Sequence, residues 1–325
     1  MRSCFAFVVA TLLASAAGPP APDADLQRVP RGLASRPAVP DNNALTPEKV
    51  ALGRRLFSDP ILSGDRTVSC ATCHVPDRCF TGSDPLAVGV RGQKNRRNAP
   101  TLLNIAYSPA FFWDGRAATL EEQALQPIAD RREMASSPDE AVARLRADSS
   151  YVVQFKSAFG DAVTTQNLAR ALASFERTLL SGDSAVDRFR YGQIADLSED
   201  AKQGLWLFEG RGGCWRCHSG NTLSDGRFHN TGVGWGGGDL GRYEITHREP
   251  DRGAFKTPTL RDVARTAPYM HDGSIATLAE VVRYYGKGGN PNPNLDKGLK
   301  PVEFSADDVR HLVAFLNALT GAQPR

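Results

Sequence analysis

Several segments of this 325-residue chain carry apolar residues at helical spacing, each after a residue type that commonly caps a helix. The clearest segment follows Ser305, where apolar residues recur three or four positions apart. They are Val309, Leu312, Val313, Leu316 and Leu319. Four more caps open helices in the same way, namely Thr46, Thr119, Ser198 and Thr277. The glycine-rich stretch Gly232–Gly241 is predicted to be a loop, and no segment alternates convincingly as a β-strand does. The pattern therefore predicts a mainly α protein with long loops.

The chain also contains an internal repeat. Residues 100–124 align without gaps on residues 258–282, an offset of 158, and ten of the twenty-five paired positions are identical. A similar helical approach lies upstream in each copy, at 52–57 and 203–208. Repeated similarity of this kind indicates copies of one structural unit. We therefore expect two tandem domains, joined near residues 181–197.

Each copy carries a C-x-x-C-H pentad, at Cys70-Ala71-Thr72-Cys73-His74 and Cys214-Trp215-Arg216-Cys217-His218. This is the attachment motif of c-type haem, in which two cysteines add to the vinyl groups of one porphyrin and the histidine ligates the iron. A zinc site and a redox C-x-x-C are the alternatives. Zinc usually takes four clustered protein ligands, and neither pentad has a further Cys/His pair at finger spacing. The sequence thus favours two covalent haem c groups in tandem cytochrome c-like domains, 41–190 and 191–325.

The N-terminus is typical of a secretory signal peptide over residues 1–18, with a basic start, an apolar run at 5–13 and small residues after it. The run is shorter than the ~20 residues of a membrane span, and no later stretch is long and apolar enough. Residues 19–40 are expected to be a flexible lead-in. We therefore predict a periplasmic protein, which suits covalent haem attachment. Cleavage would remove Cys4, and Cys79, outside both pentads, is expected to be a buried small apolar side chain.

The remaining charged residues change this picture little. The formal net charge of +3 is too small to indicate nucleic acid binding, and no basic run is interleaved with aromatic residues. His229 is expected in a loop or on the surface. The basic cluster Arg91, Lys94, Arg96 and Arg97 is expected on a solvated face, with contact to haem propionates or to an acidic partner as the alternative.

The repeat predicts that different side chains face the two irons. A haem that activates peroxide needs an open sixth position, whereas an electron-transfer haem usually has both axial positions filled. Tyr285 is a possible sixth ligand of the His218 haem, and the paired residue on the side of His74 is Pro127, which has no ligand atom. Met270 is a rival thioether donor, but it pairs with Phe112 in the repeat and is more naturally a core residue. Tyr285 could instead simply pack. The sequence therefore suggests one closed haem and one open haem.

The open haem has two polar candidates for peroxide chemistry, Gln123 and Glu133. Peroxide cleavage needs a group that takes a proton from the near oxygen and returns it to the leaving oxygen, and a carboxylate with an orienting amide suits this task. Val281 replaces Gln123 in the second half. Because Glu133 follows Arg131 and Arg132, a solvated surface position is the alternative for its side chain.

The chain resembles the bacterial di-haem cytochrome c peroxidase family, including its MauG-type branch, from about Leu45 to Gly321. Five stretches in this order around the pentads carry the resemblance: 62–65, 97–101, 112–116, 255–260 and 267–273. It implies that Gln123 and Glu133 are the peroxide-pocket pair and that Trp113 lies between the haems and couples them. It also implies a calcium ion between the domains, held by oxygens of Asn98, Thr266 and Pro268, a donor type that suits a hard cation.

Two departures from ordinary family members match the MauG-type branch. Ordinary members have a blocking histidine where we align Val90 and a methionine where we align Tyr285. The MauG-type branch uses hydrogen peroxide without prior reduction to oxidise side chains of another protein. At one position the chain also differs from MauG itself: Gly212 stands where MauG has a surface tryptophan that reaches its partner protein.

Three functions remain open at this point. The first is a periplasmic MauG-type peroxidase acting on hydrogen peroxide and a protein substrate. The second is a cytochrome c peroxidase that takes electrons from a small cytochrome c or cupredoxin. The third is a non-catalytic di-haem electron-transfer cytochrome, which Gln123, Glu133 and the Pro127–Tyr285 difference argue against.

Overall fold

The computed structural model describes residues 26–33 and 35–322, so the predicted signal peptide and part of the lead-in lie outside the described residues. The described chain is mainly helical, as predicted, and its two strands are only two residues long. The helices are α1 (Pro47–Ser58), α2 (Cys70–Cys73), α3 (Leu120–Ala129), α4 (Pro138–Ala147), α5 (Ser149–Phe159), α6 (Thr165–Glu176), α7 (Ala185–Arg190), α8 (Glu199–Glu209), α9 (Tyr243–Thr246), α10 (Leu278–Gly286) and α11 (Ala306–Asn317). The strands are β1 (Phe228–His229) and β2 (Phe255–Lys256), which pair antiparallel. Among the described residues, none of the helices has the length and apolar character needed to cross a bilayer.

All five predicted caps lie where the sequence indicates. The side chains of Thr46, Thr119, Ser198, Thr277 and Ser305 each accept a hydrogen bond from a backbone N–H in the first turn of α1, α3, α8, α10 and α11. These bonds satisfy N–H groups that have no partner inside the helix. Residues 232–241 form a loop, as expected. Local chemistry therefore accounts for where the main helices begin.

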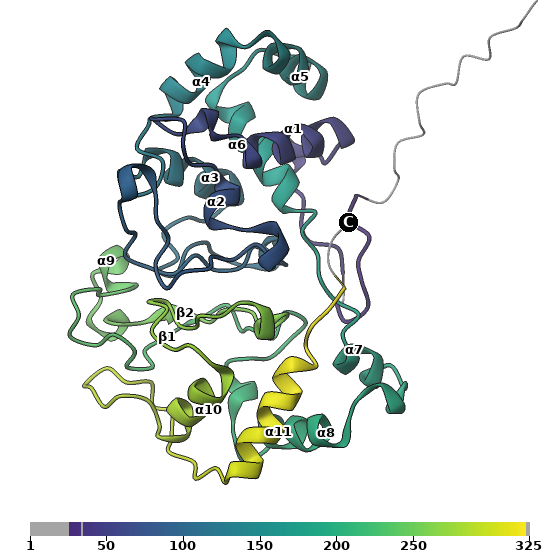
Figure 1. Ribbon diagram of the computed structural model, residues 1–325, viewed down its shortest axis with the longest axis vertical. Helices are drawn as coiled ribbons and strands as arrows, with labels where there is room; N and C mark the ends of the chain where they lie inside the picture. The colour runs from purple at the N-terminus through teal and green to yellow at the C-terminus, as the bar shows by residue number, and fades with distance from the viewer. Residues whose placement is uncertain (1–25, 34, 323–325) are drawn as a thin grey trace, which may run out of the picture.

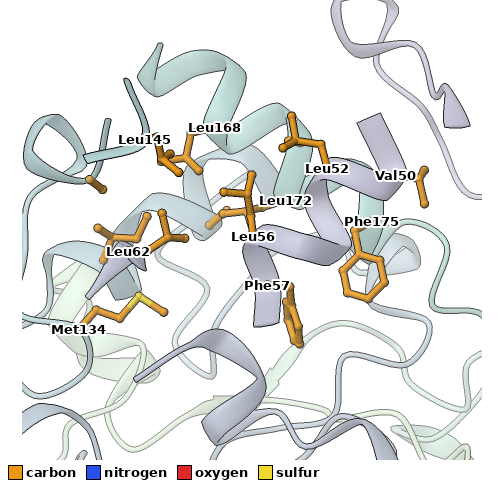
Figure 2. Packing of buried hydrophobic residues seen from close by; sticks show 14 of the residues in the cluster. Val50, Leu52, Leu56, Phe57, Leu62, Met134, Leu145, Leu168, Leu172 and Phe175 are labelled. Atoms are coloured by element: carbon orange, nitrogen blue, oxygen red, sulfur yellow. The ribbon is translucent and has the colours of Figure 1, made fainter. Parts of the chain in front are cut away.

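The first hydrophobic cluster joins α1 and α6 with the segments around them (Figure 2). Leu56, Phe57 and Leu172 are buried in it, and the rings of Phe57 and Phe175 meet edge to face with centroids 5.2 Å apart. Cys79 is fully buried in the same cluster, which confirms the prediction for this side chain. The cluster lies in the upper part of Figure 1, where these helices cover the chain that follows α2.

The second cluster joins α8, α10 and α11, in the lower part of Figure 1. Its centre is formed by Phe208 and Phe315, whose ring centroids are 4.9 Å apart. One glycine allows close helix approach in each cluster. A Cβ atom on Gly53 of α1 would lie 2.0 Å from the carbonyl oxygen of Ala171, and one on Gly204 of α8 would lie 2.0 Å from that of His311. Only glycine permits backbones to approach so closely.

The two aligned segments have the same local geometry 158 residues apart. Asn104 and Asp262 both have φ +59°, and each is followed by a 3₁₀ turn. Phe111 bridges Ala117 as Tyr269 bridges Ile275. The helices α3 and α10 then begin at Leu120 and Leu278, again 158 residues apart.

The halves meet through backbone hydrogen bonds and ion pairs, and the ion pair between Arg261 and Asp187 is buried. The Lys256 N–H donates to the Trp113 carbonyl at 2.8 Å, and the Asn98 N–H donates to the His271 carbonyl at 2.7 Å. Within the segment 19–40, the Gly32 carbonyl accepts a hydrogen bond from Arg261, which also pairs with the buried Asp187 at 2.8 Å. These contacts hold the segment 256–271, which precedes α10, against the first half.

Candidate active site

The first pentad lies on α2, whose start is fixed by a capping box between Ser69 and Thr72. His74 ends this short helix, and its Nδ1 lies 3.1 Å from the Phe80 carbonyl oxygen. Since a carbonyl oxygen only accepts, Nδ1 carries the proton and Nε2 keeps its lone pair. Burial lowers the pKa of His74, which also favours the neutral ring. This is the usual arrangement of a metal-ligating histidine.

The second pentad has the same histidine geometry. A 3₁₀ turn runs over Cys214–Arg216, and the His218 Nδ1 lies 3.0 Å from the Leu223 carbonyl oxygen. Burial lowers the pKa of His218 as well. Both rings are therefore held with Nε2 available to a metal.

The thiols and imidazoles do not form a zinc site. Among the described residues, the one close group of three potential ligand atoms from His, Cys, Asp and Glu is Cys217, Asp225 and His229. It contains neither pentad histidine. His229 in this group lies between the carboxylates of Asp225 and Asp296, at 2.9 and 2.5 Å, so the expectation of a surface histidine was wrong. The ring bridges two acidic segments that are far apart in sequence.

A cavity of about 750 Å³ adjoins the second pentad. Cys214, Cys217 and His218 lie on its wall, together with Tyr285 from α10. The volume is in the range of cofactor sites, and two thiols beside an available imidazole nitrogen are the donor set of a c-type haem. These residues fit a haem. Met270, the rival to Tyr285, also lines the cavity, so the wall holds both candidate ligands.

Pro127 lies within α3 at the position that Tyr285 occupies in α10, seven residues after the first residue of each helix. Gln123 is half-buried on the same helix α3. Among the described residues, no hydrogen bond joins Gln123 to Glu133.

Glu133 faces inward, whereas its neighbours Arg131 and Arg132 are exposed. Its Oε1 accepts a hydrogen bond from Asn95 Nδ2 at 2.7 Å, and burial raises the pKa of Glu133. The carboxylate also raises the pKa of the Cys70 and Cys73 thiols, although burial is the larger cause for both. Glu133 therefore lies beside the first pentad rather than on a solvated face.

Val90 packs against the same segment. It is 2% exposed, and its backbone N–H donates to the Glu133 carbonyl at 2.9 Å. The Cys73 Sγ lies 3.9 Å from the carbonyl oxygen of Val88, so this loop adjoins the pentad as well. The position where ordinary family members are expected to have a histidine is thus apolar and close to both Cys73 and Glu133.

Trp113 lies at the junction of the halves and lines the cavity. Its Nε1 donates to the Asn98 carbonyl at 2.9 Å. The ring meets that of His271 edge to face with centroids 6.4 Å apart, and His271 stacks on Phe255 at 3.5 Å. The three rings form a continuous aromatic path between segments of the two halves.

The three predicted calcium ligands, Asn98, Thr266 and Pro268, all line this cavity. Asn98 donates from Nδ2 to the carbonyls of Asp84 and Pro85. In the basic cluster, Arg91, Lys94 and Arg96 are exposed, as expected. Arg97 differs, because its side chain is only 11% exposed and binds Asp114 and Asp239 at 2.5 and 2.7 Å. This arginine holds the loop 232–241 to the first half.

Glu176 is a buried acid that the sequence analysis did not single out. It is 5% exposed, and its Oε2 has no hydrogen-bond partner in the described part of the chain. Burial raises the pKa of Glu176 to about 8, and its carboxylate raises the pKa of the nearby Cys70 thiol. It lies four residues after Leu172 on the buried face of α6, a spacing that could have revealed it.

The surface near the second pentad exposes two tryptophans. Trp206 on α8 is 65% exposed and Trp215, inside the pentad, is 48% exposed. Neither occupies position 212, where the sequence has glycine.

Comparisons with known proteins agree with this geometry. Residues 47–195 match the family described as di-haem cytochrome c peroxidase. The methylamine utilization protein MauG of Methylorubrum extorquens is 44% identical over 86% of this chain and 80% of its own length. A cytochrome c551 peroxidase of Nitrosomonas europaea is 37% identical over 90% of this chain and 86% of its own. A crystal structure of a MauG-like protein associated with microbial copper homeostasis superposes with a TM-score of 0.82 at 35% identity, covering 89% of this chain and 93% of that one.

Proposed function

We propose that this chain, which belongs to the di-haem cytochrome c peroxidase family and is an oxidoreductase with two haem cofactors, is a periplasmic peroxidase of MauG type. It would use hydrogen peroxide to oxidise a partner protein. The observation that carries the proposal is the contrast between α3 and α10: Tyr285 lies on the cavity wall with Cys217 and His218, and α3 has Pro127 at the same position.

Each pentad would hold one haem covalently. Cys70 and Cys73 would form the thioether bonds on one side and Cys214 and Cys217 on the other, with His74 and His218 as proximal ligands. Bound in this way, the two haems supply the redox chemistry: H₂O₂, two protons and two electrons give two water molecules, and the electrons come from the protein substrate.

The residues around His74 would handle the protons. Glu133 would take the proton from the near oxygen of peroxide and return it to the leaving oxygen, while Gln123 orients the molecule. The hydrogen bond from Asn95 occupies only Oε1 of Glu133 and leaves Oε2 for this task. Because burial raises the pKa of Glu133, the carboxyl gains and loses a proton more readily near neutral pH than an exposed glutamate does.

Trp113 would couple the two halves. Its edge-to-face contact with His271 supports this role. Val90 would leave the first iron accessible in the fully ferric protein, since a valine offers no ligand atom.

We also propose that the halves, 41–190 and 191–325, are copies of one cytochrome c-like unit. The shared geometry at Asn104 and Asp262 and at the starts of α3 and α10 supports this origin. A calcium ion held by Asn98, Thr266 and Pro268 would lie between them, as their common position on the cavity wall allows.

The test is to add one equivalent of hydrogen peroxide to the fully ferric protein and follow Soret and near-infrared absorption by stopped flow. A rapid change with a near-infrared charge-resonance band is expected, because oxidation would be shared by both haems. No reaction until one electron is supplied would contradict the MauG-type proposal.

A cytochrome c peroxidase that uses a small redox protein is the second candidate. The position of Met270 on the cavity wall favours it, because a thioether ligand would suit a haem that accepts electrons easily. Reaction only after one-electron reduction would support this function. Two closed haems that never react with peroxide would indicate the third function, electron transfer alone.

A further inference from the structure

Lys256 ends β2 at the junction of the halves and lies on the wall of the cavity beside the second pentad. Its backbone is fixed, since its N–H donates to the Trp113 carbonyl. Its Nζ donates to the Ser108 hydroxyl of the first half at 2.6 Å. The backbone hydrogen bond fixes the residue and the Ser108 hydrogen bond fixes the ammonium group at the cavity.

No described carboxylate neutralises this ammonium. Lys256 takes part in none of the ion pairs of the described residues, and the Ser108 hydroxyl is a neutral partner. Asp225 is the one acidic residue on the cavity wall in the described part of the chain, and it is paired with His229 at 2.9 Å. Burial lowers the pKa of Lys256 to about 8, consistent with a cation removed from water without a counter-charge.

The other cations on the wall differ from Lys256. Arg216 and Lys300 are exposed, and Arg211 is exposed and paired with Asp308. A buried charge is costly unless it is paired. The group that fills the cavity should therefore bring negative charge to Lys256.

We propose that Lys256 Nζ binds a carboxylate of the cofactor in this cavity, namely a propionate of the second haem. This inference rests on the proposed function, because it requires a haem at the second pentad. Only the second half has a lysine at this position. The paired residue in the first half is Asn98, a neutral side chain that donates to the carbonyls of Asp84 and Pro85. The ammonium also favours the ferrous state of the second haem over the ferric state, since the ferric state carries one more positive charge.

The experiment compares the holoprotein with Lys256→Gln by spectroelectrochemical titration. Loss of the positive charge should lower the reduction equilibrium constant of the second haem roughly tenfold, which is about 59 mV for a one-electron couple. The first haem should change much less. The propionate-bending band of the second haem should also shift in the resonance Raman spectrum.

Lys300→Gln is the matched control, because Lys300 lines the same cavity but is exposed. Lys256→Arg should keep the wild-type potential, because it keeps the charge. If Lys256→Gln does not fold, Lys256→Met preserves the packed stem and should give the same lowered potential. A shift no larger than that of Lys300→Gln, or an equal loss in Lys256→Arg, would overturn the inference.

These measurements use no peroxide, so their outcome distinguishes a failure of the proposed function from a failure of the inference about Lys256. A wild-type protein without haem at the second pentad would contradict the proposed function. A haem present there, with a potential and Raman band insensitive to Lys256, would contradict this inference alone.

Discussion

In the first half α3 carries Pro127 seven positions after its first residue, and in the second half α10 carries Tyr285 at the same position. The pentad histidines of the two halves are held alike, with Nδ1 3.1 and 3.0 Å from a carbonyl oxygen. The side chains near the pentads differ in charge. Glu133 and Glu176 are buried carboxyls near Cys70. Lys256, on the wall of the cavity beside the second pentad, has no carboxylate partner among the described residues.

The comparison distinguishes the local backbone features, which the two halves share, from the side chains near the pentads, which differ. Capping threonines, the 3₁₀ turns and the histidine hydrogen bonds occur in both halves, so they belong to the local backbone geometry that the halves share. The buried acids Glu133 and Glu176 lie on one side, and a tyrosine and a cation lie on the other. We infer that the division of labour between the two haems comes from a few side chains on a common backbone.

The largest effect should come from removing the acid of the first half. Glu133→Gln should slow the peroxide reaction about 100-fold, or about 2.7 kcal/mol, because the amide cannot take a proton. Burial raises the pKa of Glu133, and in the proposed mechanism the carboxylate is the form that takes the proton. The wild-type rate should therefore fall as the pH drops through that raised pKa, and the variant should lose this pH dependence. Stopped-flow absorption at several pH values measures both.

Glu48→Gln is the control for that change, because Glu48 is an exposed carboxylate of the same half. It should leave the rate and its pH dependence as they are. Equal rates in wild type and Glu133→Gln would remove Glu133 from the mechanism and would weaken the contrast between the halves.

The close helix crossings offer the next test. Gly53→Ala and Gly204→Ala each direct a Cβ atom at a backbone oxygen 2.0 Å away. Overpacking of this kind costs about 1–3 kcal/mol, and we expect the two halves to respond alike. Urea unfolding followed by the absorption of the haems gives the loss of stability. Gly82→Ala is the control, because its Cβ would meet nothing closer than 3.4 Å, and a Gly53→Ala loss no larger than this control would contradict the crossing argument.

The sequence predicted much of the scaffold because the relevant signals are local. Each capping residue acts within three positions, so the helix starts could be predicted directly. The pentads are contiguous in sequence, so the haem attachment sites could be proposed from the sequence alone. The inward turn of Glu133 could not, since it depends on Asn95, 38 positions away. His229 and Arg97 were misjudged for the same reason: their acidic partners Asp296 and Asp239 are distant in sequence.

Exchange of the tyrosine should have a smaller effect than loss of Glu133. Tyr285→Met should raise the reduction equilibrium constant of the second haem roughly tenfold, about 59 mV, because a thioether stabilises ferric iron less than a phenolic oxygen does. Spectroelectrochemical titration measures it. Tyr284→Phe is the control, since that hydroxyl binds the Thr231 carbonyl at 2.7 Å. An unchanged potential in Tyr285→Met would mean that the tyrosine does not sense the iron, and would favour Met270.

The smallest effect compares the two paired caps directly. Thr119 Oγ1 accepts from the Glu122 N–H at 3.1 Å, and Thr277 Oγ1 accepts from the Glu280 N–H at 3.2 Å. Thr→Ala at either position should cost about 1 kcal/mol of unfolding free energy. The loss should be greater at Thr277, because this threonine belongs to a capping box: the Glu280 carboxylate also accepts a hydrogen bond from the Thr277 N–H at 2.9 Å. Alanine would break one of the two hydrogen bonds of that box. Denaturant unfolding measures both, and Thr→Ser should restore most of each loss, since serine keeps the accepting oxygen. If serine were no better than alanine, the lost stability would come from the threonine methyl group, and the two helices would differ in packing rather than in their caps.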